Sequence, residues 1–283
     1  MKIEKGCKVF ITGAASGIGR STAVKTARMG AKLFLTDINA SGLEETVETI
    51  RSDNGDVALY KVLDVSDYDA VKTFADEIHR EHGSMDIVMN IAGVALFALI
   101  DDMTHDRWER VININLWGPI YCIECFIPEM IRAGKGGHIV NISSTAGLTG
   151  APWHAAYSTT KWGLRGLSEV LRYDLMRHNI GVTVVCPGAV DTPIQQVTEI
   201  VNVDRESDYM KKMLQRFSNH AVTPERVADL IVDAVRKNKF LVITSFDIKL
   251  VYFLKRKCFP LYHLVMKKIS RMMNKARQAP QEP

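Results

Sequence analysis

Residues 8–19 read KVFITGAASGIG, and this stretch decides the fold. Val9 to Thr12 are apolar or β-branched, which predicts a short buried strand. Gly13, Gly17 and Gly19 follow, and the chain is then compatible with a helix as far as Gly30. Because glycine lacks a Cβ, backbone N–H groups in such a turn can approach a pyrophosphate at the positive end of the helix. A tight turn that only packs a helix against a strand is the alternative.

Strand and helix patterns alternate along the rest of the chain. Further apolar strand patterns occur at residues 31–36, 57–63, 86–90, 138–142, 181–186 and 240–244. Such alternation predicts an α/β fold, a single-domain doubly wound parallel sheet of the Rossmann type. We expect residues 1–246 to form one domain that carries the glycine turn, including a lid at about 192–222. Residues 247–283 would form a basic amphipathic C-terminal tail.

The composition limits the class of protein. A chain of 283 residues with 47% hydrophobic and 24% charged content can bury a full core. We find no secretory signal pattern and no apolar run close to the roughly 18 residues that a membrane span needs. The five cysteines are odd in number, which is typical of free thiols and a cytoplasmic setting. Cys122 and Cys125 have no second pair nearby, so we expect no metal site.

Asp37 predicts the choice of nucleotide. It ends the second expected strand, eighteen residues after Gly19. A carboxylate there can accept hydrogen bonds from both ribose hydroxyls and would repel a 2′-phosphate, which favours NAD over NADP. Neither Ser16 nor Ile38, the expected neighbours, is basic. A helix N-cap is the alternative interpretation of Asp37.

The chemistry is expected between residues 141 and 161. Tyr157 and Lys161 are four apart, so on a helix they share one face, and an ammonium there would lower the pKa of the phenol. Ser144 follows an expected strand, and its hydroxyl can polarise the same substrate oxygen. Asn115 lies within an expected helix at 108–130, although asparagine is a mediocre helix former. It would either hold a water toward Lys161 or make a polar packing contact.

Apolar segments surround this region. Residues 94–100, 148–153 and 194–217 are rich in apolar side chains, which indicates a lipophilic substrate, such as a sterol or a long-chain lipid derivative. For residues 94–100, ordinary core packing is an equally good explanation. Thr192 follows a Pro187-Gly188 turn, and its hydroxyl could reach a nicotinamide carboxamide.

Taken together, residues 5–245 resemble the short-chain dehydrogenase/reductase family. The matching motifs are Thr12 to Gly19, Asp64-Val65, Asn90-Ile91-Ala92-Gly93, Asn115, Ser144, Tyr157 with Lys161, and Pro187-Gly188 with Thr192. The resemblance implies an NAD(H)-dependent oxidoreductase that transfers hydride between the nicotinamide and a secondary alcohol or ketone. By the same resemblance, Tyr157 is the general acid/base and Ser144 holds the substrate oxygen. The whole domain, residues 1–246, would then bind NAD and carry out the catalysis. Lys161 would bind the nicotinamide ribose, and Asn115 would support a proton relay. The implied cofactor-binding residues are Gly13, Ser16, Gly17, Ile18, Gly19, Asp37, Asp64, Val65, Asn90, Ala92, Gly93, Tyr157, Lys161, Pro187, Gly188, Val190 and Thr192.

The sequence departs from the family pattern in two places. Ile91 replaces the usual second asparagine, which should not disturb cofactor binding. The glycine-rich ending of many tetrameric members is replaced here by residues 245–250 and a basic tail. We therefore expect a homodimer through the helices around Asn115 and Leu167. The alternatives are an NADP-dependent reductase of 3-oxoacyl or other ketones, and a non-catalytic dinucleotide sensor that docks on membranes or partners.

The tail concentrates positive charge. Residues 247–277 contain nine Lys or Arg against Asp247 alone, a net of +8, whereas residues 1–246 carry a net of −3. Apolar residues recur there at helical spacing. A basic amphipathic helix can lie on an anionic membrane surface, or it can cap its own domain or a partner subunit. No nucleic-acid motif accompanies the charge, so we expect no nucleic-acid partner.

Overall fold

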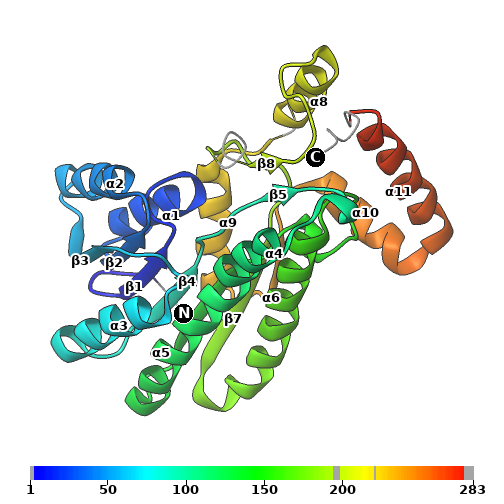
Figure 1. Cartoon of the computed structure of the whole chain (residues 1–283). Helices are drawn as coiled ribbons and strands as arrows, with labels where there is room; N and C mark the ends of the chain where they lie inside the picture. Colours follow the sequence, from blue (N-terminus) through cyan, green and yellow to red (C-terminus); the bar gives the residue numbers. More distant parts are fainter. Residues whose placement is uncertain (1–2, 194–197, 220, 277–283) are drawn as a thin grey trace.

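The computed structural model describes residues 3–193, 198–219 and 221–276. Within them, seven parallel strands form one sheet in the order β3-β2-β1-β4-β6-β7-β9. Helices cover both faces of this sheet (Figure 1). The predicted doubly wound parallel sheet of the Rossmann type is confirmed.

The sheet strands follow the sequence pattern to within a residue or two. They are β1 (Lys8–Thr12), β2 (Lys32–Asp37), β3 (Asp56–Val62), β4 (Ile87–Asn90), β6 (Gly137–Ile142), β7 (Ile180–Cys186) and β9 (Leu241–Ile243). The helices are α1 (Gly17–Arg28), α2 (Ala40–Ser52), α3 (Tyr68–His82), α4 (His105–Ile112), α5 (Gly118–Ala133), α6 (Ala155–Asp174), α8 (Asp208–Ser218), α9 (Pro224–Arg236), α10 (Phe246–Lys257) and α11 (Phe259–Asn274). A second, two-stranded sheet pairs β5 (Leu96–Phe97) with β8 (Glu199–Ile200).

The winding direction of the sheet reverses at β1. Val9 pairs with Leu33 of β2 on one side and with Ile87 of β4 on the other. The chain runs outward from β1 to β3, crosses back to β4, and then continues in the other direction. Ligands of open α/β sheets bind where the strand order reverses, outside the carboxyl ends of the strands. The glycine turn after β1 and the Ala92-Gly93 segment after β4 meet at this point.

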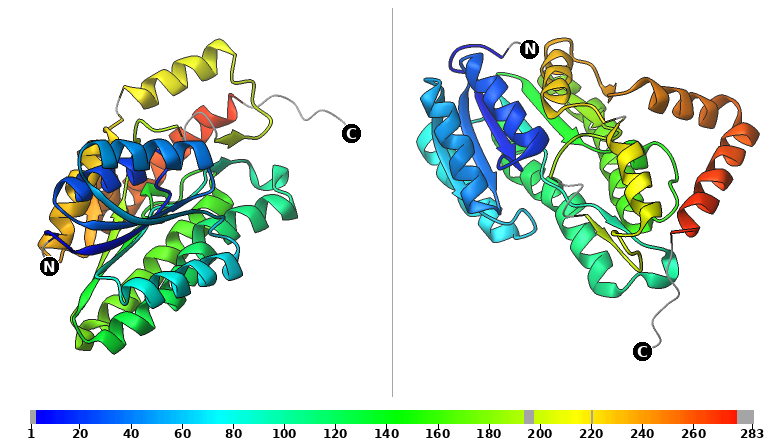
Figure 2. Two further views of the ribbon diagram at one scale, coloured as in Figure 1. Left: turned by 90° about the vertical axis from the view of Figure 1, so that its left-hand side faces the viewer. Right: turned by 90° about the horizontal axis from the view of Figure 1, so that it is seen from above.

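Two apolar cores lie on the two faces of the sheet. Side chains alternate between faces along β1, so Val9 and Ile11 belong to the core under α1, α2 and α9, and Phe10 belongs to the other. On that second face, under α3 and α5, the Phe10 ring centroid lies 4.4 Å from that of Phe126. Figure 2 shows the two layers of helices with the sheet between them.

The helix expected at 108–130 is longer and less regular than predicted. α4 continues through a π-helical turn, Asn113–Trp117, directly into α5. Among the described residues, His105–Ala133 is long and apolar enough to cross a membrane by length and composition, which the sequence analysis did not anticipate. In this fold it packs against α3 and α6, with Cys122 and Phe126 buried. Its apolar character therefore has an explanation in core packing.

The region expected as a lid contains β8 and α8. Glu199 of β8 accepts hydrogen bonds from Arg107 and Arg110 at 2.9 and 3.2 Å, which holds the start of this region against α4. Residues 194–197 and 220 of the expected lid, and residues 277–283 of the expected tail, lie outside the described residues.

Candidate active site

Ser144, Tyr157 and Lys161 come together beyond the carboxyl end of β6. Ser144 follows this strand and precedes a 3₁₀ turn, where its Oγ accepts a hydrogen bond from Ala146 N at 3.1 Å. It also lies close enough to Tyr157 to act on the pKa of the phenol. Tyr157 and Lys161 lie in the first turns of α6, with Lys161 Nζ 5.6 Å from the centroid of the tyrosine ring. The three side chains predicted to carry the chemistry are thus neighbours.

Lys161 is held from two sides. Its side chain is buried, and Nζ donates a hydrogen bond to the Ile142 carbonyl at 3.0 Å. Its own carbonyl accepts one from Ser143 Oγ at 2.8 Å. Burial lowers the pKa of Lys161 to about 8. Ser143 was missed by the sequence analysis, and its position directly before Ser144 was the available signal.

The pKa of Tyr157 moves in the direction opposite to the prediction. Burial raises the pKa of this phenol, and the nearby Ser144 side chain lowers it by less. The expected lowering by Lys161 fails because the ammonium is itself desolvated, with a pKa of about 8, and points to the Ile142 carbonyl.

Asn115 lies in the π-helical turn and is fully buried. Its Nδ2 donates to the Val94 carbonyl at 2.8 Å, and its Oδ1 accepts from Val94 N at 2.9 Å. The polar packing contact considered for this residue is therefore present. A Cβ on Gly93 would lie 2.9 Å from Asn115 Oδ1 and 3.4 Å from Lys161 Nζ, so both side chains border Gly93. π-helical turns inside α-helices are frequent at functional sites.

The glycine turn fits a dinucleotide phosphate group. A Cβ on Gly19 would lie 1.8 Å from the Gly13 carbonyl oxygen, so no side chain is tolerated there. Ser16 is the N-cap of α1, and it is exposed with no capping hydrogen bond from its side chain. Because the first turn of α1 contains no acidic residue, the positive helix end is available to an anion. Thr192 lies over this turn, with Cγ2 2.8 Å from the position of a Cβ on Gly17.

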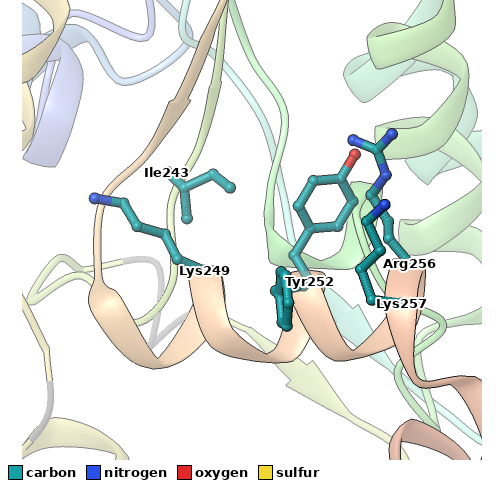
Figure 3. A pocket seen from close by; sticks show the side chains of 6 residues that line it. Ile243, Lys249, Tyr252, Arg256 and Lys257 are labelled. Atoms are coloured by element: carbon teal, nitrogen blue, oxygen red, sulfur yellow. The ribbon is translucent and has the colours of Figure 1, made fainter.

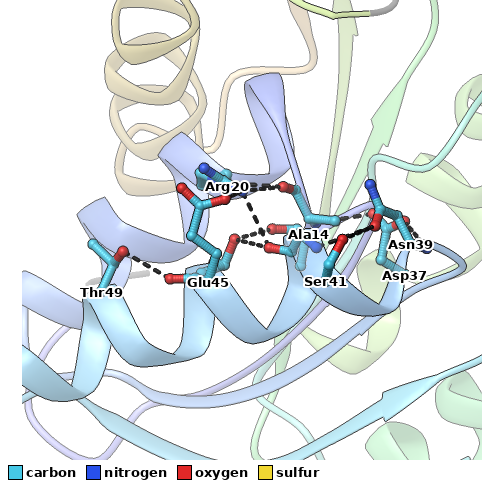
Figure 4. A network of polar contacts seen from close by, with 10 residues as sticks. Ala14, Arg20, Asp37, Asn39, Ser41, Glu45 and Thr49 are labelled. Carbon is cyan, nitrogen blue, oxygen red and sulfur yellow. Dashed lines mark hydrogen bonds and ion pairs between the residues drawn. The ribbon is translucent and has the colours of Figure 1, made fainter.

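Asp37 ends β2 and points toward the glycine turn (Figure 4). Its Oδ2 accepts from Ala15 N and its Oδ1 from Asn39 N, both at 2.9 Å. The N-cap of α2 is Asn39, so the helix-cap interpretation of Asp37 is wrong. The nearby cation, Arg20, donates to the Ala15 carbonyl at 2.7 Å and to Glu45 at 2.8 Å. Its charge is therefore already paired.

The remaining predicted cofactor residues line the ends of neighbouring strands. Asp64 Oδ1 accepts from Ser66 N at 2.9 Å, and Val65 is buried against Gly118. Asn90 is buried and donates to Asn141 Oδ1 at 2.8 Å. Ile18 is partly buried and packs against the core under α1.

Thr12, which the motif contained but the analysis gave no role, connects β1 to the segment after β4. Its Oγ1 accepts from Ile91 N at 3.0 Å and from Ala92 N at 3.1 Å. Because these bonds use the main chain, the Ile91 departure leaves them intact. The Ile91 side chain packs against the apolar core under α1, α2 and α9.

The Pro187 turn lies beside the 3₁₀ turn that follows Ser144. The Pro187 carbonyl accepts from Thr145 N at 2.8 Å, and Gly188 N donates to Thr244 Oγ1 at 3.1 Å. Val190 forms a parallel bridge with Val222. These contacts fix the segment that leads to Thr192.

The apolar segment 94–100 is divided between core and surface. Leu96 and Ala98 are buried in a small cluster with Val111, whereas Ile100 is 68% exposed. Core packing thus explains Leu96 and Ala98. Between the buried pair, the Phe97 ring centroid lies 4.1 Å from that of His154, which in turn lies 6.1 Å from that of Tyr157.

Trp153, in the second apolar segment, has a left-handed backbone with φ of 66°, a conformation that strains a bulky residue. Its carbonyl accepts from Ala98 N at 2.8 Å, and its Nε1 donates to Asn274 Oδ1 of α11 at 2.9 Å. The sequence analysis missed this feature, because no local motif marks a tryptophan for this conformation.

Comparisons with known proteins agree with this geometry. The family model for short chain dehydrogenases matches residues 8–202. The oxidoreductase EphD of Mycobacterium tuberculosis is 37% identical over 238 residues, which cover 82% of this chain but only 40% of EphD. A second M. tuberculosis protein, named as oxidoreductase SadH, is 34% identical over 90% of this chain and 92% of its own length.

Solved structures give the same result. A short-chain dehydrogenase/reductase from Burkholderia phymatum in complex with NAD has a TM-score of 0.81 and 26% identity, with full coverage of both chains. Other similar structures hold NAD or NADP. The chain therefore belongs to the short-chain dehydrogenase family.

Proposed function

We propose that this enzyme transfers hydride between NAD and a lipophilic secondary alcohol or ketone. The observation that carries the proposal is the meeting of Ser144, Tyr157 and Lys161 beside Gly93, next to a glycine turn suited to a dinucleotide. The bound nicotinamide would accept or supply the hydride at its C4. The described side chains would hold the substrate oxygen and move its proton.

Tyr157 is the group that gives or takes this proton. Its hydroxyl lies near that of Ser144, so a substrate oxygen placed between them would meet two donors. Lys161, with a pKa of about 8, can exchange a proton near neutral pH. Asn115 supports this arrangement by fixing Val94 and bordering Gly93, and a water between Asn115 and Lys161 would extend the proton path.

The environment of Asp37 favours NAD. Each carboxylate oxygen accepts one main-chain hydrogen bond and keeps a lone pair for a ribose hydroxyl. A 2′-phosphate would meet this negative charge, and Arg20 is paired with Glu45 instead of facing the same place. Use of NADP is the alternative, and the Asp37 variants below distinguish the two.

Apolar surroundings favour a lipophilic substrate. Phe97 and His154 lie in ring contact beside Tyr157, and Trp153 is buried next to them. A 3-oxoacyl compound or another ketone is the alternative within the same reaction class. A non-catalytic dinucleotide sensor is disfavoured because the catalytic side chains are all present and in contact range.

We also propose that the protein is a homodimer and that it is cytoplasmic. Exposed apolar side chains on the helices around Asn115 and Leu167 support a homodimer through α5 and α6; they are Trp117, Val170 and Tyr173. We place the enzyme in the cytoplasm, where its five free cysteines would remain reduced.

Replacing Tyr157 by Phe removes the proposed acid/base and should lower kcat by roughly 10²- to 10⁴-fold. Binding of NADH, followed by fluorescence titration, should be nearly unchanged because the ring remains. Tyr173→Phe, which removes a hydroxyl from an exposed tyrosine of α6, is the matched control. Retained turnover in Tyr157→Phe with intact NADH binding would overturn the assignment.

Replacing Asp37 by Ala should shift the ratio of kcat/KM for NAD to that for NADP toward NADP by about 10- to 100-fold. Hydrogen bonds to a charged group contribute about 1.5–3 kcal/mol, and each 1.4 kcal/mol is about tenfold. Asp37→Asn keeps one acceptor oxygen and removes the charge, so it isolates the repulsion. If neither variant changes the ratio, Asp37 does not set the preference.

Lys161→Met tests the buried ammonium through stability. Because the pKa of Lys161 falls from 10.5 to about 8 on folding, the unfolded chain binds the extra proton between these pH values. The free energy of unfolding of the wild type should therefore rise with pH relative to Lys161→Met, by up to about 3 kcal/mol. Urea denaturation at several pH values measures this difference. Lys249→Met, the same change at an exposed site, is the control, and a pH-independent difference would contradict the prediction.

A homologous series of 2-alkanols tests the substrate class. Each methylene that becomes buried is worth about 0.8 kcal/mol, so kcat/KM should rise by at most about fourfold per carbon until the apolar walls are filled. Initial rates of NADH formation give the values. Faster turnover of small polyols than of these alcohols would rule out a lipophilic site.

A further inference from the structure

The outward face of α10 mixes apolar and basic side chains. Helical spacing places Phe246, Leu250 and Phe253 together, and they are 79%, 48% and 57% exposed. Lys249, Arg256 and Lys257 are exposed on the same side of the helix. Large apolar side chains exposed in such a group are uncommon on a surface that faces only water.

α11 repeats the arrangement. Leu261, Leu264 and Met272 are 45%, 62% and 39% exposed. They share one side of the helix with four exposed bases, Lys267, Lys268, Arg271 and Lys275. We call the outward sides of α10 and α11 together the C-terminal face.

The opposite sides of both helices are already bound to the body of the enzyme. Lys255 Nζ donates to the Leu148 carbonyl at 2.9 Å, and Arg165 donates to the Tyr252 hydroxyl at 2.8 Å. Tyr262 is buried, and its hydroxyl accepts from Gly150 N at 3.0 Å. The chain therefore uses one side of each helix for its own core, and the C-terminal face remains outside.

The bases of this face have no acidic partners within the described part of the chain. No salt bridge joins them to a described carboxylate, and residues 246–276 hold eight bases against Asp247. Lys249, Arg256 and Lys257 line a pocket together with Tyr252 and Ile243 (Figure 3), and Phe253 also lines it. None of the residues lining this pocket belongs to the catalytic group.

We infer that the C-terminal face docks onto the surface of an anionic lipid bilayer. Exposed apolar side chains can enter the headgroup boundary, while lysine and arginine reach the lipid phosphates on their flexible stems. A second copy of the same face would bring like charges together, so self-association through it is disfavoured. The opposite charge of an anionic bilayer meets both features of the surface.

Docking would also bring the bilayer close to the active site. α11 contacts both segments that flank the substrate side, through Asn274 with Trp153 and through the Met272 carbonyl, which accepts from the Tyr209 hydroxyl of α8 at 2.7 Å. A lipophilic alcohol dissolved in the bilayer would then be near the catalytic tyrosine. This consequence rests on the proposed function, whereas the docking itself does not.

Vesicle sedimentation tests the docking with the full-length enzyme and neither cofactor nor alcohol present. We expect at least tenfold tighter binding to phosphatidylcholine vesicles containing about one third phosphatidylglycerol than to phosphatidylcholine alone. Phe253→Ser with Leu264→Ser, and separately Lys257→Glu with Lys268→Glu, should each weaken binding to the anionic vesicles at least tenfold.

Matched controls are Val62→Ser and Lys135→Glu, which change an exposed valine and an exposed lysine of other elements and should bind like the wild type. Thermal melting confirms that each variant folds, and light scattering reports its oligomeric state. The proposal is overturned if the wild type ignores anionic vesicles, or if folded variants bind them as the wild type does. It is also overturned if the tail variants change the oligomeric state while vesicle binding is absent, because the face would then join two copies.

Discussion

The close approach of two main-chain segments at the reversal of the sheet is the constraint on which the rest of the structure depends. A Cβ on Gly13 would lie 2.7 Å from Ala92 N, so the turn after β1 and the segment after β4 touch backbone to backbone. Thr12 adds two hydrogen bonds across the same junction. This contact brings the two halves of the sheet together beside the proposed nucleotide site and the proposed acid/base group, and a side chain at Gly13 would separate them.

A second set of buried polar contacts fixes the reacting groups relative to that junction. Asn90 of β4 bonds to Asn141 of β6, and Asn141 donates to Ser168 of α6 at 2.9 Å. Buried hydrogen bonds of this kind orient the elements that carry them, because breaking one would leave buried polar groups unsatisfied. α6 therefore presents Tyr157 and Lys161 to the end of β4 in one defined position. The low dielectric that strengthens these bonds also lowers the pKa of Lys161.

Much of the fold and of the site could be predicted because the signals are local. Alternating strand and helix patterns predicted the sheet, and the motif residues Ser144, Tyr157 and Lys161 proved to be neighbours. What failed depends on packing between distant segments. The π-helical turn at Asn115 arises where the helix meets Val94, and the shift of the Tyr157 pKa follows from burial that no spacing reveals. The two contacts of Trp153 likewise join residues far apart in sequence.

The left-handed Trp153 has a consequence for how relatives of this enzyme can diverge. Its indole donates a hydrogen bond to Asn274 of α11, and its carbonyl accepts one from Ala98 in the segment before α4. α11 therefore helps to position the residues beside Tyr157. The family match ends at residue 202, well before that helix. Two members could thus inherit the same cofactor and proton machinery and still select different alcohols through unrelated C-terminal segments. Under the proposed function, substrate choice could therefore evolve through the C-terminal segment while the inherited chemistry stays the same.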